Sequence, residues 1–192
     1  MRKVIETTLV SLDGVVEDVS QWGRDYFDAA WWEASLRTAE ACDALLMGRN
    51  TYEMLGGETR ALLSAARAGE PLPPYAEAYA SRLDDIRKYV FSSTLKEPDW
   101  ANSVLVRGDV AAEVAKLKRE EGQDILIYGH GPLGQALLKH DLLDEMHFSI
   151  HPALVGRGQT MLRENVEAEL RLIESRTLAN GVVVVRYEPI RG

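Results

Sequence analysis

The chain has 192 residues and a mass of 21.4 kDa, a length typical of one domain with one hydrophobic core. Hydrophobic residues make up 46% of the chain and charged residues 27%, a balance that excludes disordered, collagen-like and fibrous classes. The formal net charge of -8 opposes a broad basic face, so we expect no nucleic-acid partner.

The sequence also bears on compartment and metal content. No apolar run approaches the ~20 residues that span a bilayer, and the first residues show no apolar signal core. We therefore expect a cytoplasmic protein with no membrane partner. Cys42 is the single cysteine, so the sequence predicts neither an intrachain disulfide nor a thiolate zinc site, and we expect no metal.

Short apolar and β-branched runs alternate with segments of helical period, which is the pattern of an α/β domain. The predicted strands are 2–10, 44–48, 88–92, 103–107, 124–128, 144–152, 168–177 and 181–188. The predicted helices between them are 25–42, 50–55, 76–86, 109–121 and 131–140. Several strands are apolar throughout, which indicates burial on both faces and therefore a parallel centre.

Two connections between these elements carry signals of their own. Gly56-Gly57, Gly69 and the prolines from 71 to 74 interrupt the segment 56–75, which predicts an inserted flap. Asn180-Gly181 separates the last two strands, and this dipeptide predicts a tight hairpin turn. The sheet is therefore expected to begin parallel and to end antiparallel.

The segment after the first strand contains the candidate catalytic residue, Asp13, in Ser11-Leu12-Asp13-Gly14. Its carboxylate would lie beside a polar substrate; alternatively, Asp-Gly forms an ordinary turn. Trp22, Trp31 and Trp32 follow. They would wall a pocket for a planar ring, although Trp31 also fits the apolar face of a helix that packs in the core.

Two later strand ends carry hydrogen-bond donors. Gly48 and then Arg49-Asn50-Thr51 follow the strand 44–48 at the start of a helix, where arginine and helix N–H groups suit a phosphate. Ser92-Ser93-Thr94 follows the strand 88–92 and offers three hydroxyls without a carboxylate. Carboxyl ends of parallel strands meet at one sheet edge, so these turns predict part of a nucleotide-sized groove. Each alone is also compatible with ordinary helix capping.

The third such turn is Gly129-His130-Gly131-Pro132-Leu133-Gly134, which matches G-x-G-x-x-G between a strand and a helix. Glycines here let the backbone approach a diphosphate at a helix N-terminus. A Rossmann site would also need an acidic residue at the end of the next strand, where this chain has Pro152-Ala153-Leu154. A phosphate-binding turn and a plain tight turn both stay open, and His130 either lines the pocket or is an exposed turn residue.

In chain order, SLDG at 11–14, LLMGRNTYE at 45–53, YVFSSTL at 89–95 and the stretch 125–158 resemble the dihydrofolate-reductase-like family. More closely, they look like its stand-alone branch, related to the reductase domain of bifunctional riboflavin-biosynthesis deaminase-reductases. The likeness spans nearly the whole chain, so residues 1–192 are expected to form one domain of this type. It implies a three-layer α/β/α fold around a mixed, mostly parallel sheet of about eight strands with a C-terminal antiparallel hairpin.

The resemblance implies that NADPH lies across the carboxyl edge of the sheet and transfers a hydride to a small substrate. Arginine and hydroxyls at that edge favour NADPH over NADH, because a carboxylate would repel the 2'-phosphate. The predicted cofactor-binding set is Gly48, Arg49, Asn50, Thr51, Ser92, Ser93, Thr94, Tyr128, Gly129, His130, Gly131, Pro132 and Leu133.

Two departures from the family limit the substrate. With one cysteine and no zinc-ligand spacing, the chain lacks the deaminase half, so any activity is that of the reductase half. Riboflavin reductases typically carry a glutamate before the glycine turn, where this chain has Tyr128, and a phenol does not replace a carboxylate at neutral pH. A dihydrofolate-type site needs an acid on the first long helix, and Asp25, Asp28 and Glu33 are all candidates.

The strand 144–152 suggests an oligomer. His147 and His151 share one face and are interpreted as half-buried or dimer-surface residues rather than metal ligands. Met146, Phe148 and Ile150 would form an apolar strand surface that needs a cover, and related reductases often form homodimers through the antiparallel edge. We therefore expect a homodimer.

The leading hypothesis is a homodimeric NADPH-dependent reductase that acts on a pterin-, pyrimidine- or ribosyl-type small molecule, similar to 5-amino-6-(5-phosphoribosylamino)uracil reductase. Two alternatives stay open. One is a non-catalytic nucleotide- or flavin-binding protein on the same fold. The other is a Rossmann dehydrogenase that uses NADH.

Overall fold

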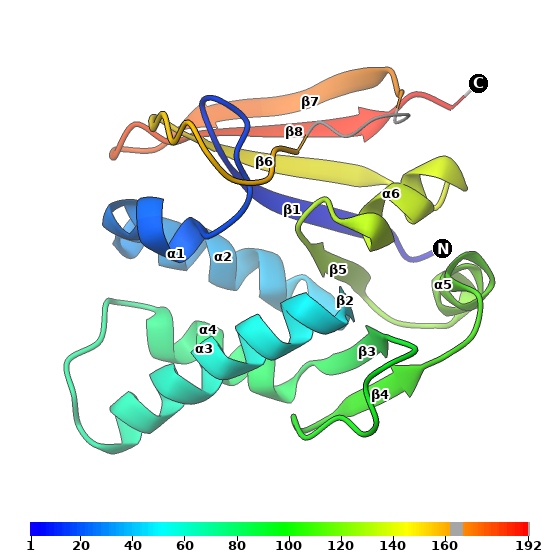
Figure 1. The fold of residues 1–192 in the computed structure, drawn as a ribbon, viewed down its shortest axis with the longest axis horizontal. Helices are drawn as coiled ribbons and strands as arrows, with labels where there is room; N and C mark the ends of the chain where they lie inside the picture. The colour runs from blue at the N-terminus through cyan, green and yellow to red at the C-terminus, as the bar shows by residue number, and fades with distance from the viewer. Residues whose placement is uncertain (162–166, 192) are drawn as a thin grey trace.

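The computed structural model describes residues 1–161 and 167–191. Its strands are β1 (Val4–Ser11), β2 (Cys42–Gly48), β3 (Arg87–Phe91), β4 (Ser103–Val106), β5 (Asp124–Tyr128), β6 (Glu145–His151), β7 (Leu170–Thr177) and β8 (Val183–Pro189). Within the described ranges they form one sheet in the order β4-β3-β2-β5-β1-β6-β8-β7 (Figure 1). The pairs from β4 to β6 are parallel, whereas β8 pairs antiparallel with β6 and β7.

The helices are α1 (Val19–Trp22), α2 (Ala29–Glu40), α3 (Arg49–Arg67), α4 (Ala76–Asp85), α5 (Val110–Arg119) and α6 (Pro132–Lys139). Side chains set two of the starts: Asp28 accepts a hydrogen bond from Trp31 N at 2.9 Å, and Asp109 accepts one from Ala112 N at 2.8 Å. Each carboxylate satisfies a backbone N–H that has no partner inside the helix. The strand positions and the α/β pattern predicted from the sequence are thus confirmed.

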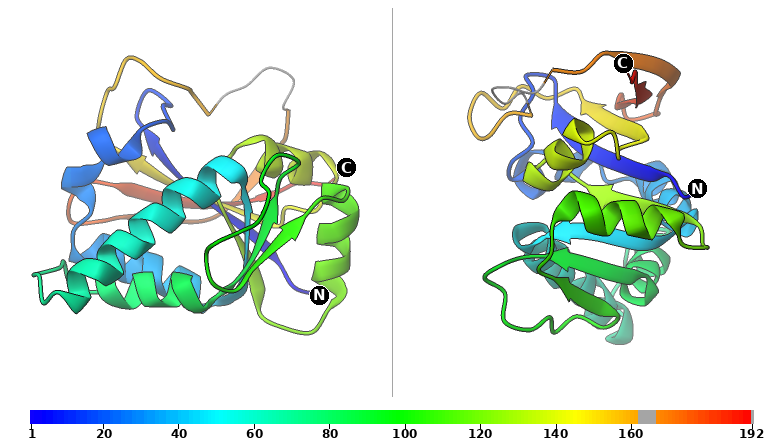
Figure 2. Two further views of the ribbon diagram at one scale, coloured as in Figure 1. Left: turned by 60° about the horizontal axis from the view of Figure 1, so that its bottom comes forward. Right: turned by 90° about the vertical axis from the view of Figure 1, so that its right-hand side faces the viewer.

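Among the described residues, two buried clusters lie on the two faces of the sheet. The first joins α2, α3 and α4 to the sheet, with Trp32, Leu55 and Tyr79 among its members. The second joins α5 and α6 to the opposite face, through residues such as Val114 and Leu137. Because helices cover both faces of the central strands, the fold is the expected three-layer α/β/α arrangement (Figure 2).

The chain ends in the predicted antiparallel hairpin. Leu178 N donates to Val182 O at 2.8 Å, and Gly181 N donates to Leu178 O at 3.0 Å. Gly181 has φ +85°, a left-handed conformation that favours glycine. The local Asn-Gly signal therefore located this turn correctly.

The segment 56–75 is not the predicted flap. α3 continues through Gly56 and Gly57 to Arg67, so the expected helix 50–55 is too short. A Cβ on Gly56 would lie 3.1 Å from Trp100 Cε3, and this close packing explains a glycine inside the helix. The predicted helix 25–42 begins too early, because a 3₁₀ turn at Arg24–Tyr26 precedes α2.

The apolar surface predicted on the strand 144–152 is also wrong in its placement. β6 is an inner strand between β1 and β8, and Met146 and Phe148 are buried against the α5 and α6 side of the sheet. Among the described residues, β7 forms that edge of the sheet and exposes Leu172 and Ile173. The homodimer itself stays a prediction.

Candidate functional site

The three donor-rich turns lie side by side at one edge of the sheet. β3, β2 and β5 are consecutive neighbours and run parallel, so their carboxyl ends meet there. A cleft of about 1430 Å³ begins at this edge and continues across the face of the sheet beside α2 to the amino ends of β1, β5 and β6. From the predicted cofactor set it is lined by Gly48, Arg49, Asn50, Thr51, Tyr128, Gly129, His130, Gly131, Pro132 and Leu133.

Arg49 connects two of the turns. It is the first residue of α3, and its Nη1 donates to Thr94 Oγ1 at 3.2 Å while its Nε donates to Glu53 Oε1 at 2.7 Å. Ser92 Oγ accepts hydrogen bonds from the N–H groups of Thr94 and Leu95, so it closes its own turn. Ser92, Ser93 and Thr94 are not among the residues that line the cleft, and Thr94 reaches it through Arg49.

The glycine turn leaves open space above its backbone. Gly129 has φ +78°, and Gly131 is the N-cap of α6. Among the described residues, no atom lies within 4 Å of the position that a Cβ would take on Gly129 or on Gly131. The first N–H groups of α6 have no intrahelical partner, and the helix dipole favours negative charge there. An open backbone at a helix N-terminus is the kind of site that suits a phosphate group.

A buried carboxylate supports the same turn. Glu6 is fully buried on β1, and His130 Nδ1 lies 3.0 Å from both of its carboxylate oxygens. Thr8 Oγ1 donates to the same group at 3.3 Å. A Cβ on Gly134 would lie 2.3 Å from Glu6 Oε2, so the first turn of α6 presses directly on this pair. His130 therefore lines the cleft in a fixed position rather than forming an exposed turn residue.

Tyr128, in the position before the glycine turn, pairs with Tyr79 of α4. The two hydroxyl oxygens are 2.8 Å apart. Burial raises the pKa of both phenols above their ordinary value, so both stay neutral around physiological pH. This part of the cleft therefore lacks the negative charge that a glutamate at position 128 would bring.

Asp13 lies outside the set of described residues that line the cleft. Its carboxylate accepts hydrogen bonds from Ser11 Oγ at 2.6 Å, Gly156 N at 2.7 Å and Val155 N at 3.1 Å. These bonds lower its pKa to about 2. They favour the turn interpretation, because this carboxylate ties the end of β1 to the loop after β6.

Two of the three tryptophans predicted to wall a pocket line the cleft, and Trp22 does not. Trp31 and Trp32 line the cleft together with Phe27, whereas Trp22 packs edge-on against His151 with ring centres 5.3 Å apart. The acids proposed from the sequence on this helix do not line the cleft: Asp28 caps α2, and Glu33 pairs with Arg37.

Two polar residues of α3 that line the cleft, Glu58 and Thr59, are absent from the set predicted from the sequence. Desolvation raises the pKa of the Glu58 carboxyl. Both residues fall in the segment predicted as a flap. Helical spacing from Thr51 through Leu55 to Glu58 and Leu62 is the signal that could have found them.

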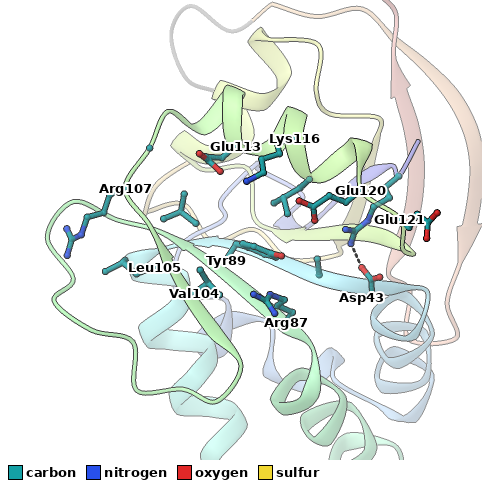
Figure 3. A pocket seen from close by; sticks show the side chains of 15 residues that line it. Asp43, Arg87, Tyr89, Val104, Leu105, Arg107, Glu113, Lys116, Glu120 and Glu121 are labelled. Carbon is teal, nitrogen blue, oxygen red and sulfur yellow. Dashed lines mark hydrogen bonds and ion pairs between the residues drawn. The ribbon is translucent and has the colours of Figure 1, made fainter.

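A second hollow, of about 670 Å³, lies beside α5 and the strands β3 and β4 (Figure 3). Arg87, Lys116 and Glu113 give it side chains of both charge signs, and it includes the ion pair of Arg2 with Asp43. It touches none of the three donor-rich turns. We therefore place the candidate site in the edge cleft.

The fold and the cleft define the class as a three-layer α/β protein of the dihydrofolate-reductase-like type, with its ligand cleft at the carboxyl edge of the sheet. More narrowly, the model of the family "RibD C-terminal domain" matches residues 2–184, and the chain belongs to this family. The family is associated with reductase activity in riboflavin biosynthesis. The relationship inferred from the sequence motifs is thereby confirmed.

The chain is also similar to individual proteins. The chain is 34% identical to YyaP of Bacillus subtilis (strain 168) over 102 residues, which is 53% of this chain and about half (54%) of that protein. The crystal structure of a putative riboflavin biosynthesis protein from Shewanella sp. PV-4 has a TM-score of 0.67 and 24% identity, and the match covers 98% of this chain and 99% of that one.

A diaminohydroxyphosphoribosylaminopyrimidine deaminase/5-amino-6-(5-phosphoribosylamino)uracil reductase from Thermotoga maritima gives a TM-score of 0.63 at 16% identity. That match covers 98% of this chain and 57% of the Thermotoga protein. At this identity the likeness shows a shared fold. In the ranges 1–161 and 167–191, no helix combines the length and apolarity needed to cross a membrane.

Proposed function

We propose that this protein is an NADPH-dependent reductase of a small heterocyclic molecule. The observation that carries the proposal is the adjacency of the turns after β2 and β5, which bring an arginine, a helix N-terminus and a glycine turn to one cleft. Family membership supports reductase chemistry in the riboflavin pathway. The cleft is large enough for a dinucleotide together with a second small molecule.

The residues present fit the cofactor. Gly129 and Gly131 leave room for a diphosphate against the N-terminus of α6, and Arg49 with Thr94 offers donors for a further phosphate. When bound, NADPH supplies a hydride to an electron-poor carbon of a C=N or C=O bond. The protein supplies orientation and exclusion of water.

The side chains around the cleft also suggest how a proton is handled. Tyr79 and Tyr128 are neutral phenols that donate and accept only between themselves in the described structure. Glu58 lines the cleft, and its raised pKa makes it the better proton holder of the two acids considered, since the pKa of Asp13 is lowered to about 2. Glu58, an exposed residue of α3 that lines the cleft, therefore replaces Asp13 as the proposed acid.

A titration of the protein with NADPH and NADH, followed by nicotinamide fluorescence, tests the proposal. We expect NADPH to bind more tightly than NADH, and Arg49→Ala to remove most of the difference. Arg60→Ala is the matched control, because Arg60 lies on the same helix, is exposed and does not line the cleft. Failure of both nucleotides to bind would refute the reductase, and flavins would be the next ligands to test.

Retention of a nucleotide without turnover is the alternative on this fold, and Tyr128 is the observation that favours it. The riboflavin-pathway reductases that this chain resembles typically carry a glutamate at that position, and a phenol does not replace a carboxylate at neutral pH. Tight NADPH binding with no oxidation across a panel of pterins and pyrimidines would support the alternative. Steady oxidation with any of them would support the enzyme.

A further inference from the structure

The cleft contains an aromatic chamber, which we define by Phe27, Trp31, Trp32, Thr59, Tyr79 and Tyr128. Its rings lie close together: the centres of Trp31 and Trp32 are 4.8 Å apart, and those of Trp32 and Tyr79 are 5.6 Å apart. The hydrogen bond between the hydroxyls of Tyr79 and Tyr128 joins this wall to the residue before the glycine turn. The chamber thus borders the proposed cofactor site.

Two buried polar atoms of the chamber have no hydrogen-bond partner among the described residues. They are Trp32 Nε1 and Thr59 Oγ1, on residues that are 9% and 1% exposed. Two other indole groups are satisfied, since Trp22 Nε1 donates to Glu17 O and Trp100 Nε1 donates to Asp84 Oδ1. Unpaired buried donors are costly in a folded protein, and these two residues both line the cleft. They are suited to an acceptor atom brought by a ligand.

The chamber contains no basic side chain. Of the cations elsewhere along the cleft, Lys3 and Arg186 pair with Glu145 and Arg37 pairs with Glu33, and Arg176 of β7 also lies in the lining, outside the chamber. Arg49 stands at the N-terminus of α3, in the proposed cofactor site. A phosphate moved into the aromatic chamber would lose its hydration without gaining a charged partner, which is strongly unfavourable.

We propose that the aromatic chamber binds a flat, uncharged conjugated ring with a carbonyl or ring-nitrogen acceptor for Trp32 Nε1 and Thr59 Oγ1, and that it rejects a phosphorylated ribosyl group. This substrate class rests on the proposed reductase function, because the ring would lie next to the bound nicotinamide nucleotide. Aromatic walls stack well on such a ring, and the neutral Tyr79–Tyr128 pair adds no charge that would repel it.

The test uses 4-methylumbelliferone, a flat carbonyl-containing ring, and 4-methylumbelliferyl phosphate, which adds only the phosphate. Binding of each is measured in mildly acidic buffer, where the phenol is uncharged, by quenching of tryptophan emission and by calorimetry. We expect the uncharged compound to bind at least about tenfold more tightly, since the phosphate has no cation in the chamber. Equal binding, tighter binding of the phosphate, or no binding of the uncharged compound overturns the proposal.

Thr59→Val tests the hydrogen bond separately from folding. The substitution replaces an unpaired hydroxyl by a methyl group of the same shape, so thermal stability should be unchanged or higher. Affinity for 4-methylumbelliferone should nevertheless fall about threefold to tenfold, and Thr59→Ser should restore part of it. Thr38→Val is the control, because the Thr38 hydroxyl already donates to Ala34 O at 3.0 Å. Unchanged ring affinity in Thr59→Val overturns the proposal.

A parallel NADPH titration of each sample distinguishes a failure of the proposed substrate class from a failure of the proposed reductase function. NADPH binding without the preference for the uncharged ring refutes the substrate class and leaves the reductase standing. Absence of NADPH binding refutes the reductase, and the substrate class proposed here falls with it. Normal NADPH binding by Thr59→Val with weakened ring binding supports both.

Discussion

The buried pair of Glu6 and His130 makes a quantitative prediction for Gly134→Ala. The new Cβ would lie 2.3 Å from Glu6 Oε2 and 3.4 Å from His130 Nδ1. Because Glu6 is fully buried, its carboxylate has no route to solvent and must move away from the imidazole. The substitution is therefore expected to disrupt both the fold around α6 and the glycine turn.

The magnitude follows from two opposing effects. Alanine is favoured over glycine in a helix by about 1 kcal/mol. Loss of a hydrogen bond to a buried carboxylate costs about 1.5 to 3 kcal/mol, and overpacking by the new methyl group costs about 1 to 3 kcal/mol. The net expectation is a loss of about 2 to 5 kcal/mol in the free energy of unfolding, together with weaker NADPH binding.

Urea unfolding followed by circular dichroism measures this loss, with Gly57→Ala as the matched control. Gly57 is an exposed glycine of α3, and among the described residues no atom lies within 4 Å of the position that its Cβ would take. Alanine there should therefore stabilise the protein by about 1 kcal/mol. The cost of Gly134→Ala should shrink in a Glu6→Ala background, because the clashing group is gone. Stabilisation by Gly134→Ala, or an equal cost in both backgrounds, would refute the reasoning.

Two further predictions concern other contacts. Burial alone would raise the pKa of Glu145, but hydrogen bonds from Lys3, His147 and Arg186 lower it to about 2. The ionised carboxylate therefore stabilises the fold fully above its ordinary pKa of 4.5, and this stabilisation is lost as the pH falls toward 2. Acid unfolding of Glu145→Gln should show a shallower fall across that window, and an unchanged slope would contradict the assignment. Tyr79→Phe leaves the Tyr128 hydroxyl without its partner and should cost about 1 to 3 kcal/mol, whereas the double variant with Tyr128→Phe should cost less than the sum of the two single changes. Thermal unfolding of the three variants measures this coupling, and strict additivity would count against it.

The parts of the fold that the sequence predicted well depend on local signals. Continuous apolar runs located the parallel strands, and the Asn180-Gly181 turn located the hairpin. The turns at Arg49 and Gly129 were recognisable because each follows such a strand and begins a helix. Their adjacency then followed from the parallel order of the strands.

The parts that failed depend on contacts between distant segments. Glu6 is a lone acid within a strand, and only the packing of α6 on β1 brings it to His130. A glycine such as Gly56 is typical of a helix end, but here Trp100, which is distant in the sequence, packs beside it within the helix. Met146 is buried rather than exposed because β8 returns to pair with β6, and this pairing has no local signal.

A crystal structure of the NADPH complex shows whether the edge cleft is the cofactor site. We predict the diphosphate against the backbone of Gly129–Leu133 at the N-terminus of α6, a further phosphate within reach of Arg49, and the nicotinamide beside the aromatic chamber. A cofactor bound instead in the hollow beside α5, or with its phosphates away from both Arg49 and the glycine turn, would contradict it.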